Sequence, residues 1–280
     1  MLAYIDWQPS LEIFSIGSFA VRWYSMMWVI GLLAAYLIVH KLYRQQQIPE
    51  EKFEPLFIYC FLGTLIGARL GHCIFYEPEY FLTSWSHALE MILPMKQGAD
   101  GAWHFTGYTG LASHGGTLMF IFALWLYSRR TKVPFLTALD NIAIVTPICA
   151  AAIRLGNLMN SEIIGKPTDV PWAFIFERVD QLPRHPGQLY EAVCYALFFV
   201  ITWIIYRRYP QRVGTGFFFG LCLFLIFTSR IFIEYTKENQ VDFESGMLLN
   251  MGQLLSIPFV VLGLYCMFGG KYCKALAEKR

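Results

Sequence analysis

The chain alternates between long apolar runs and shorter polar connections. A helix that crosses a bilayer needs about 20 residues, and seven apolar runs approach or exceed that length. We place them at about 20–40, 55–76, 111–128, 138–159, 190–206, 214–235 and 247–269. The pattern predicts an all-α polytopic membrane protein with about seven transmembrane helices, folded as a single domain over residues 1–280. The connections 77–110 and 160–189 are too long for plain turns, and we expect them to form a small exterior head or lid.

The composition agrees with a membrane protein. Of the 280 residues, 56% are hydrophobic and 15% are charged, whereas a soluble domain has about 25% charged residues. The seven cysteines lie mostly inside apolar runs, so we expect neither a disulfide framework nor a zinc site. The first basic residue is Arg22, and without an earlier positive charge we expect no signal peptide.

Basic residues are distributed unevenly between the two sets of connections. One set carries 13 Lys and Arg residues, and the alternate set carries five. Because Lys and Arg accumulate on the cytoplasmic side, the asymmetry places the N-terminus outside and the C-terminus inside, as an odd number of spans requires. The remaining arginines lie within or at the edge of apolar runs: Arg22, Arg69, Arg154 and Arg230. In this orientation all four lie at one depth, beneath the outer headgroups.

Other polar residues are expected at the same depth as these arginines. They are Tyr24, His72, His114, Glu162, Glu191 and Glu234. A charge at the bilayer centre costs roughly 2.5–3.5 kcal/mol, so a helix that keeps one usually has a use for it. The inner halves of the predicted spans carry no comparable set. The sequence therefore predicts a polar, net-basic cavity that opens to the outer leaflet.

The stretch Ile153–Gly165 closes one apolar run with a dense group of polar residues. Arg154 and Asn157 are three residues apart and share one helix face, and Glu162 follows. Arginine binds phosphate through a planar, bidentate fork, so this position favours a phospholipid headgroup as its ligand. The alternative is an arginine that only reaches the headgroups or packs against a neighbouring helix.

Three further candidates each allow two interpretations. Arg230 and Glu234 are an i, i+4 pair in which the glutamate either neutralises the arginine or orients it toward an anion. Arg69 either contacts the lipid or forms an ion pair with a carboxylate such as Glu234. His114 precedes Gly115 and Gly116 at the mouth of a predicted span. It either belongs to the scaffold or acts in the chemistry, where the glycines would let a substrate approach.

Other motifs favour structural roles. Glycines recur at every fourth position from Gly63 to Gly71, a spacing that permits close helix packing. The glycines of residues 214–220 follow no predicted strand, so we expect helix packing there and no nucleotide site. His185 lies between two prolines in a connection, and we expect a structural role for it.

Motifs of several enzyme classes are missing from the sequence. It has no closely spaced aspartates of the Mg²⁺-binding kind, no His-Glu-x-x-His and no Gly-x-Ser-x-Gly. We therefore expect an anion site built from arginine, with no metal or other cofactor and no nucleic-acid partner.

Together, these motifs resemble the bacterial prolipoprotein diacylglyceryl transferase family. The matching segments are Ile153–Gly165, Arg69–Gly71, Ser113–Gly116, Arg184–Pro186, Gln188–Glu191, Arg230 with Glu234, and Met251–Pro258. The similarity runs from Ser15 through the last apolar run, although residues 77–110 match poorly. Ser161 stands where the family commonly has glycine, and Lys237 replaces a usual arginine.

The resemblance implies a reaction and a location. The diacylglyceryl group of phosphatidylglycerol would move to the lipobox cysteine thiol in the signal peptide of a prolipoprotein, forming a thioether and releasing glycerol phosphate. The location would be the bacterial cytoplasmic (inner) membrane, with the active site facing the outer leaflet. A lipid flippase or lipid-binding scaffold is the alternative, and it would need a polar path to the inner leaflet.

The resemblance and the expected depth together select the site residues. The catalytic candidates are His114, Arg154 and Arg230, with His114 as the base. The substrate-binding candidates are Arg154, Asn157, Glu162, Gly165, Tyr24, Arg69 and Glu234. We expect the arginines to neutralise the departing phosphate.

Overall fold

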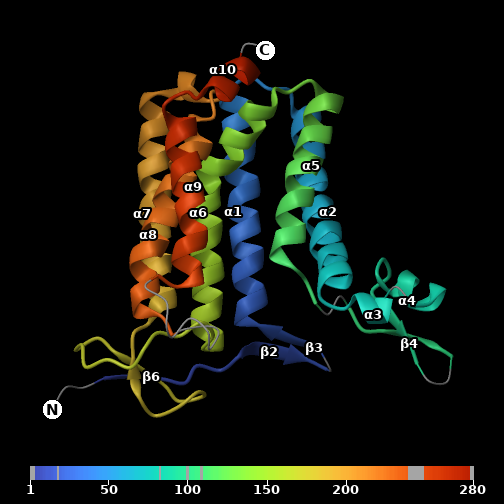
Figure 1. The fold of residues 1–280 in the computed structure, drawn as a ribbon, viewed down its shortest axis with the longest axis vertical. Coiled ribbons are helices and arrows are strands. Elements are labelled where there is room, and N and C mark those ends of the chain that lie inside the picture. The colour runs from blue at the N-terminus through green and yellow to red at the C-terminus, as the bar shows by residue number, and fades with distance from the viewer. Residues whose placement is uncertain are drawn as a thin grey trace. The chain divides into compact units, whose positions relative to one another are not determined.

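A computed structural model describes residues 4–17, 19–81, 83–98, 101–107, 110–238 and 249–277. The start of the seventh predicted span, a few positions of 77–110, and Lys279 and Arg280 lie outside these ranges. The chain forms two compact units, Met1–Leu42 with Leu139–Arg280 and Tyr43–Ala138. Both are mostly helical (Figure 1).

The first unit is chiefly a helical bundle. Its helices are α1 (Trp23–Gln45), α6 (Phe135–Asn160), α7 (Gly187–Arg208), η1 (Pro210–Arg212), α8 (Phe217–Ile233), η2 (Glu234–Thr236), α9 (Met251–Met267) and α10 (Lys271–Ala277). Small residues allow close contacts between them. A Cβ added to Gly31 of α1 would lie 3.3 Å from the Cβ of Ala152 in α6. A Cβ on Gly220 of α8 would lie 2.5 Å from the carbonyl oxygen of Gly263 in α9, so Gly220 has the predicted packing role.

Gly214 and Gly216 have a different role from the helix packing predicted for them. Their φ angles are 83° and 82°, a region that glycine adopts without strain. Their N–H groups donate to the carboxylate of Asp140 at 2.8 and 3.0 Å, and the Phe219 N–H donates to it at 2.9 Å. Asp140 is fully buried. The glycine-rich turn therefore wraps a carboxylate of α6 at the N-terminus of α8, where the helix dipole favours negative charge.

Short strands show that the all-α prediction is wrong in detail. The strands of the first unit are β1 (Ile5–Trp7), β2 (Glu12–Ile16), β3 (Phe19–Arg22), β6 (Phe174–Phe176) and β7 (Pro183–Arg184). β6 pairs in parallel with β1 and antiparallel with β7, while β2 and β3 form a hairpin. The sheet of β1, β6 and β7 with its connections forms a small head on this unit. Trp7 donates its indole N–H to the Leu158 carbonyl at 2.9 Å, which ties the head to α6. Strands of two to five residues carry too short a pattern for the sequence to predict them.

The second unit is a pair of packed helices with an appended arm. Its elements are α2 (Glu50–Phe75), α3 (Pro78–Phe81), α4 (Trp85–Glu90), β4 (Met95–Gln97), β5 (Trp103–Phe105) and α5 (Ser113–Thr131). A Cβ on Gly67 of α2 would lie 2.4 Å from the Gly115 carbonyl oxygen of α5, and one on Gly71 would lie 2.9 Å from the Gly115 Cα. This contact confirms the close packing predicted from the glycine spacing. The arm, from α3 to β5, occupies the connection 77–110.

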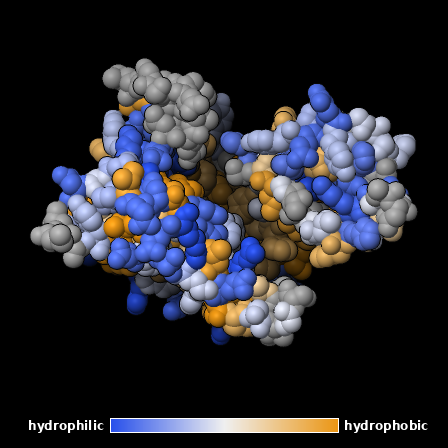
Figure 2. All heavy atoms as spheres, turned by 90° about the horizontal axis from the view of Figure 1, so that it is seen from below, coloured by the Kyte–Doolittle hydropathy of each residue, from blue (hydrophilic) through white to orange (hydrophobic). Residues whose placement is uncertain are grey.

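Within the described residues, helices occur at all seven predicted spans, and five of these helices are long and apolar enough to cross a membrane. α9 is a shorter apolar helix, and α5 has polar first and last turns that shorten its apolar centre. On α7, Val193, Leu197 and Val200 are exposed, whereas Glu191 is fully buried. Exposed apolar faces around a polar interior are expected in lipid, and the chain is a multi-pass membrane protein. In contrast, the end of the first unit that carries β6 exposes many hydrophilic residues (Figure 2).

Candidate functional site

Arg154 lies near the C-terminal end of α6 and faces α7. Its Nε is 2.9 Å from Oε2 of Glu191, and its side chain is 20% exposed while that of Glu191 is fully buried. Its NH1 is 3.5 Å from Oδ1 of Asn157, one helical turn later. The buried glutamate therefore holds the Nε side of the guanidinium, and the Arg154 side chain as a whole stays partly exposed.

Asn157 is oriented by the turn that follows α6. Its Nδ2 donates to Oε2 of Glu162 at 2.9 Å, and Asn160 donates to the other carboxylate oxygen at 3.1 Å. Ser161 and Ile163, on either side of Glu162, have φ angles of 56° and 57°. Left-handed backbone is unfavourable for both side chains, above all for a β-branched one. The turn is strained, and within it Glu162 accepts from the Asn157 side-chain amide, which leaves Oδ1 of Asn157 facing Arg154.

Gly165 is required by a close crossing of three backbone segments. Its N–H donates to the His185 carbonyl at 2.9 Å, and the Lys166 N–H donates to the Thr236 carbonyl at 2.8 Å. A Cβ on Gly165 would lie 2.5 Å from the first carbonyl oxygen and 2.6 Å from the second. The end of the Ile153–Gly165 stretch thereby holds the backbone next to Lys237.

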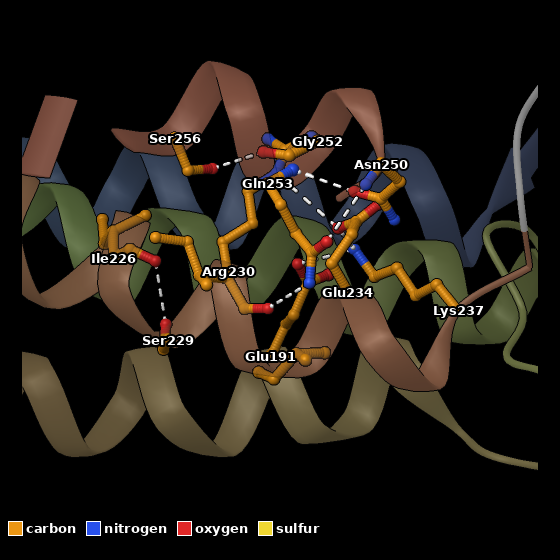
Figure 3. A network of polar contacts seen from close by, with 12 residues as sticks. Glu191, Ile226, Ser229, Arg230, Glu234, Lys237, Asn250, Gly252, Gln253 and Ser256 are labelled. Atoms are coloured by element: carbon orange, nitrogen blue, oxygen red, sulfur yellow. Dashed lines mark hydrogen bonds and ion pairs between the residues drawn. The ribbon is translucent and has the colours of Figure 1, made fainter. Parts of the chain in front are cut away.

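Three buried charged groups connect Arg154 to Arg230. Figure 3 shows Glu191, Lys237, Glu234 and Arg230 of this network. Lys237 Nζ lies 2.9 Å from Oε1 of Glu191 and 3.4 Å from Oε2 of Glu234. Glu234 Oε2 is also 3.8 Å from Nε of Arg230, whose side chain is 34% exposed. The ion pairs therefore run Arg154–Glu191–Lys237–Glu234–Arg230. These contacts join Arg154 and Arg230 within the first unit, and their convergence with Asn157 and His114 on one cavity stays a prediction.

The start of α9 closes the network behind Glu234. Asn250 and Gln253 form a reciprocal capping box, and the Gln253 side chain donates to the Ile231 carbonyl of α8 at 3.0 Å. A Cβ on Gly252 would lie 2.7 Å from the Glu234 carboxylate carbon. A side chain at this position would displace Glu234, which gives a physical reason for glycine here.

The head is fixed by a second ion-pair cluster. Arg184 donates Nε to Asp180 Oδ2 at 3.0 Å and NH1 to the Gly165 carbonyl at 3.1 Å, and it also bonds to Glu238. The Arg184 guanidinium holds the pKa of Asp180 below its usual range. Burial lowers the pKa of His185, whose Nδ1 lies 3.1 Å from the Tyr190 hydroxyl. Arg184 and His185 thus support the head, in line with the structural role predicted for His185.

Tyr24 lies in the first turn of α1, against the Arg154 turn of α6. A Cβ on Gly156 would lie 3.1 Å from Cδ2 of Tyr24, so the glycine makes room for the ring. Tyr24 is half-buried. The structure thus places this predicted substrate-binding residue beside the arginine stretch.

Arg69 belongs to the second unit and has the contacts of a structural residue. It is buried, its NH2 donates to the Glu90 carbonyl at 2.9 Å, and its guanidinium lies 4.9 Å from the centre of the Phe81 ring. Glu90 also accepts from the Tyr80 hydroxyl at 2.9 Å. Arg69 therefore holds the arm onto α2. Glu234 pairs with Lys237 and Arg230 in the first unit, and the suggested Arg69–Glu234 pair stays a prediction.

His114 is exposed in the first turn of α5. The following glycines were interpreted as an opening for substrate, but they pack against α2. A Cβ on Gly116 would lie 3.3 Å from the Cβ of Ala68 and from the Thr64 carbonyl oxygen. His114 belongs to the second unit, and its convergence with Arg154 stays a prediction.

The sequence-based site omitted the two residues at the centre of the network. Glu191 was expected at the right depth but received no role, although it ends the matching segment Gln188–Glu191. From the sequence, Lys237 is one of the five basic residues predicted in the exterior connections. The sequence did offer one signal for Lys237: it lies three residues after Glu234 and seven after Arg230, which is one helical turn and two helical turns away. Its burial follows only from the fold.

Comparison with known proteins identifies the family of the chain. The chain matches the family described as prolipoprotein diacylglyceryl transferase over residues 12–269. It is 58% identical over 268 residues to the phosphatidylglycerol–prolipoprotein diacylglyceryl transferase of Bacteroides fragilis, covering 96% of each chain. It is 42% identical to that of Tolumonas auensis, over 93% of this chain and 95% of the relative. The Vibrio cholerae relative of the same name is 36% identical, over 92% and 91%. The chain therefore belongs to the prolipoprotein diacylglyceryl transferase family.

Proposed function

We propose that this protein transfers the diacylglyceryl group of phosphatidylglycerol to the lipobox cysteine thiol of prolipoproteins. Family membership across nearly the whole chain supports the activity. One observation supports our location of the active site. Arg154 and Arg230 are both partly exposed, and each contacts a buried glutamate. The remaining candidates are assigned roles around that pair.

The phosphate of the lipid is the expected ligand of both guanidiniums. Phosphatidylglycerol is a phosphodiester with one negative charge, and an arginine fork matches its oxygens in geometry and in charge. Glu191 contacts Nε of Arg154, so the outer nitrogens of that side chain remain directed away from the buried carboxylate. Asn157 and Tyr24 lie beside this position and are assigned to the headgroup. Glu162 would orient Asn157 through its hydrogen bond to the Asn157 amide. Gly165 would contribute by allowing the close backbone crossing next to Lys237.

The reaction is a displacement at the glyceryl carbon. The thiol loses its proton, a sulfur–carbon bond forms, and the bond from that carbon to the phosphate oxygen breaks. The phosphodiester becomes a glycerol phosphate monoester with one additional negative charge. Arg154 and Arg230 would stabilise this charge more in the transition state than in the ground state, which is what accelerates a reaction.

The thiol needs activation because the thiolate is the nucleophile. We assign His114, exposed at the start of α5, as the general base that accepts the proton. Positive charge at the site would raise the thiolate fraction further. We assign Arg69 to holding the arm, since its contacts lie with Glu90 and Phe81.

The distribution of Lys and Arg supports a membrane orientation. We propose seven spans, formed by the five longer helices together with α5 and α9, with the N-terminus outside and the C-terminus in the cytoplasm. The site would then face the outer leaflet of the bacterial inner membrane. The head and the arm would lie on the outer side, where an exported precursor arrives.

Reconstitution tests the proposed function. The purified protein is placed in vesicles containing phosphatidylglycerol and given a lipobox peptide with one cysteine. We expect a diacylglyceryl mass increase on the peptide and release of glycerol phosphate in equal amount. Vesicles of phosphatidylethanolamine and a peptide with serine in place of cysteine serve as controls. Lipid movement between leaflets without peptide modification would reject the transferase assignment in favour of a flippase.

A further inference from the structure

Lys237 is a buried lysine whose ammonium group lies between two carboxylates. It is 3% exposed, and its Nζ contacts Glu191 at 2.9 Å and Glu234 at 3.4 Å. It immediately follows η2, and the Gly165 crossing holds its backbone in place. A buried lysine is rare unless it is paired, and here it is paired twice.

Each of these carboxylates also faces one arginine. Glu191 lies 2.9 Å from Arg154, and Glu234 lies 3.8 Å from Arg230. The five side chains carry three positive and two negative charges, which leaves one net positive charge. Lys237 and both glutamates are buried, whereas the arginine side chains are 20% and 34% exposed. The uncompensated charge is therefore presented by the guanidiniums.

We propose that Lys237 is a positioning residue that keeps the two arginines available for a monoanionic phosphodiester. It shares both glutamates, so neither glutamate neutralises its arginine completely. Without Lys237, the five-residue network loses its net charge. Glu234 would then be free to close its 3.8 Å separation from Arg230 and occupy the nitrogens that the phosphate needs. Lys237 does not touch the substrate in this account, which rests on the proposed function.

The test compares Lys237→Met with a variant that restores the charge balance. Lys237→Met removes the charge and keeps an unbranched side chain of similar length. We expect kcat/KM for phosphatidylglycerol to fall about 10- to 100-fold, mainly through KM, as for loss of one charge-assisted contact. Adding Glu234→Gln returns the network to one net positive charge. The kcat/KM of the double variant should therefore be at least about tenfold higher than that of Lys237→Met. Lys237→Arg keeps the charge and should remain within about tenfold of the parent protein.

A matched control separates this effect from general electrostatics. Lys166 is exposed in the adjacent segment, and Lys166→Met removes the same charge outside the network. It should leave kcat/KM within about twofold of the parent protein, as for an exposed charge. Thermal unfolding in detergent reports whether each variant is folded.

Each outcome has a defined meaning. If Lys237→Met is folded and keeps parental KM, the proposal is wrong. If it does not fold, the double variant carries the test, because it buries no unpaired carboxylate. A folded double variant with activity reduced more than about 100-fold would overturn the proposal, because Lys237 would then act on the substrate directly. Failure of the parent protein to modify the peptide would instead reject the proposed function.

Discussion

Replacing Gly165 by alanine should disrupt both stability and activity. The added Cβ would lie 2.5 Å from the His185 carbonyl oxygen and 2.6 Å from that of Thr236, both of them backbone atoms. A normal contact is about 3.5 Å, so the segments would have to separate by about 1 Å. Neither backbone can rotate away as a flexible side chain would. The neighbouring hydrogen bonds, Gly165 to His185 and Lys166 to Thr236, would weaken together.

The magnitude follows from these contacts. Overpacking costs about 1–3 kcal/mol, and each weakened backbone hydrogen bond costs up to about 1.5 kcal/mol. We expect a total loss of about 2–5 kcal/mol in unfolding free energy. Thr236 precedes Lys237, so the displacement also moves Lys237 Nζ away from Glu191, now 2.9 Å distant. A misplacement of about 1 Å can reduce catalysis about 100-fold.

The matched control is Gly187→Ala, two residues after His185. A Cβ on Gly187 would meet Lys237 Cγ at 3.5 Å and Cε at 3.8 Å, which are ordinary contacts. Gly187 begins α7, where alanine is favoured over glycine by up to about 1 kcal/mol. Thermal unfolding in detergent and peptide modification in vesicles measure both variants. Parental melting temperature and activity in Gly165→Ala would show that the crossing does not require glycine, and the reasoning would fail.

Four further predictions address single residues. Arg154→Lys should lower activity about 10- to 100-fold, because lysine lacks the bidentate fork, and activity within twofold of the parent would reject that role. His114→Gln should preserve lipid binding but lower kcat roughly 10²–10⁴-fold, with part of the rate regained between about pH 7 and 9 as the thiol ionises unaided. Parallel pH–rate profiles would show that His114 positions substrate. Ser161→Gly should raise the melting temperature, because φ of 56° costs a non-glycine residue about 1–2 kcal/mol, and a lower value would contradict the strain. The pKa of Asp180 is lowered by Arg184, so this pair stabilises the head above the unfolded pKa of about 3.9 and less as pH falls through the folded pKa. Asp180→Asn should therefore lower the melting temperature at pH 7, and a loss that did not shrink below about pH 4 would exclude the ion pair.

Much of the helical architecture could be predicted from the sequence because it depends on local patterns. Long apolar runs correspond to the seven main helices, with shifts at their ends. The spacing Gly63–Gly71 correctly predicted a close helix contact, since i, i+4 positions share a face whatever the partner is. The Arg154–Asn157 contact was predictable for the same reason, because both residues lie on consecutive turns of α6.

The strands, in contrast, depend on partners far away in the chain. Ile5 pairs with Phe174, and neither three-residue segment carries enough alternation to predict the pairing. Arg69 shows the same limit for a charged residue. The depth of Arg69 in its span suggested a lipid contact, but its partner Glu90 comes from a connection that matched the family poorly.

By itself the sequence determined the membrane class, the helices and the cluster of polar residues around Arg154, because apolar length and helical spacing are local properties. Only the tertiary structure decided how the charges are shared. Glu191 and Lys237 are 46 positions apart, and their contact exists because the Gly165 crossing brings η2 against the start of α7. Burial then makes the pairing obligatory, since an unpaired charge in that interior would be several kcal/mol unfavourable.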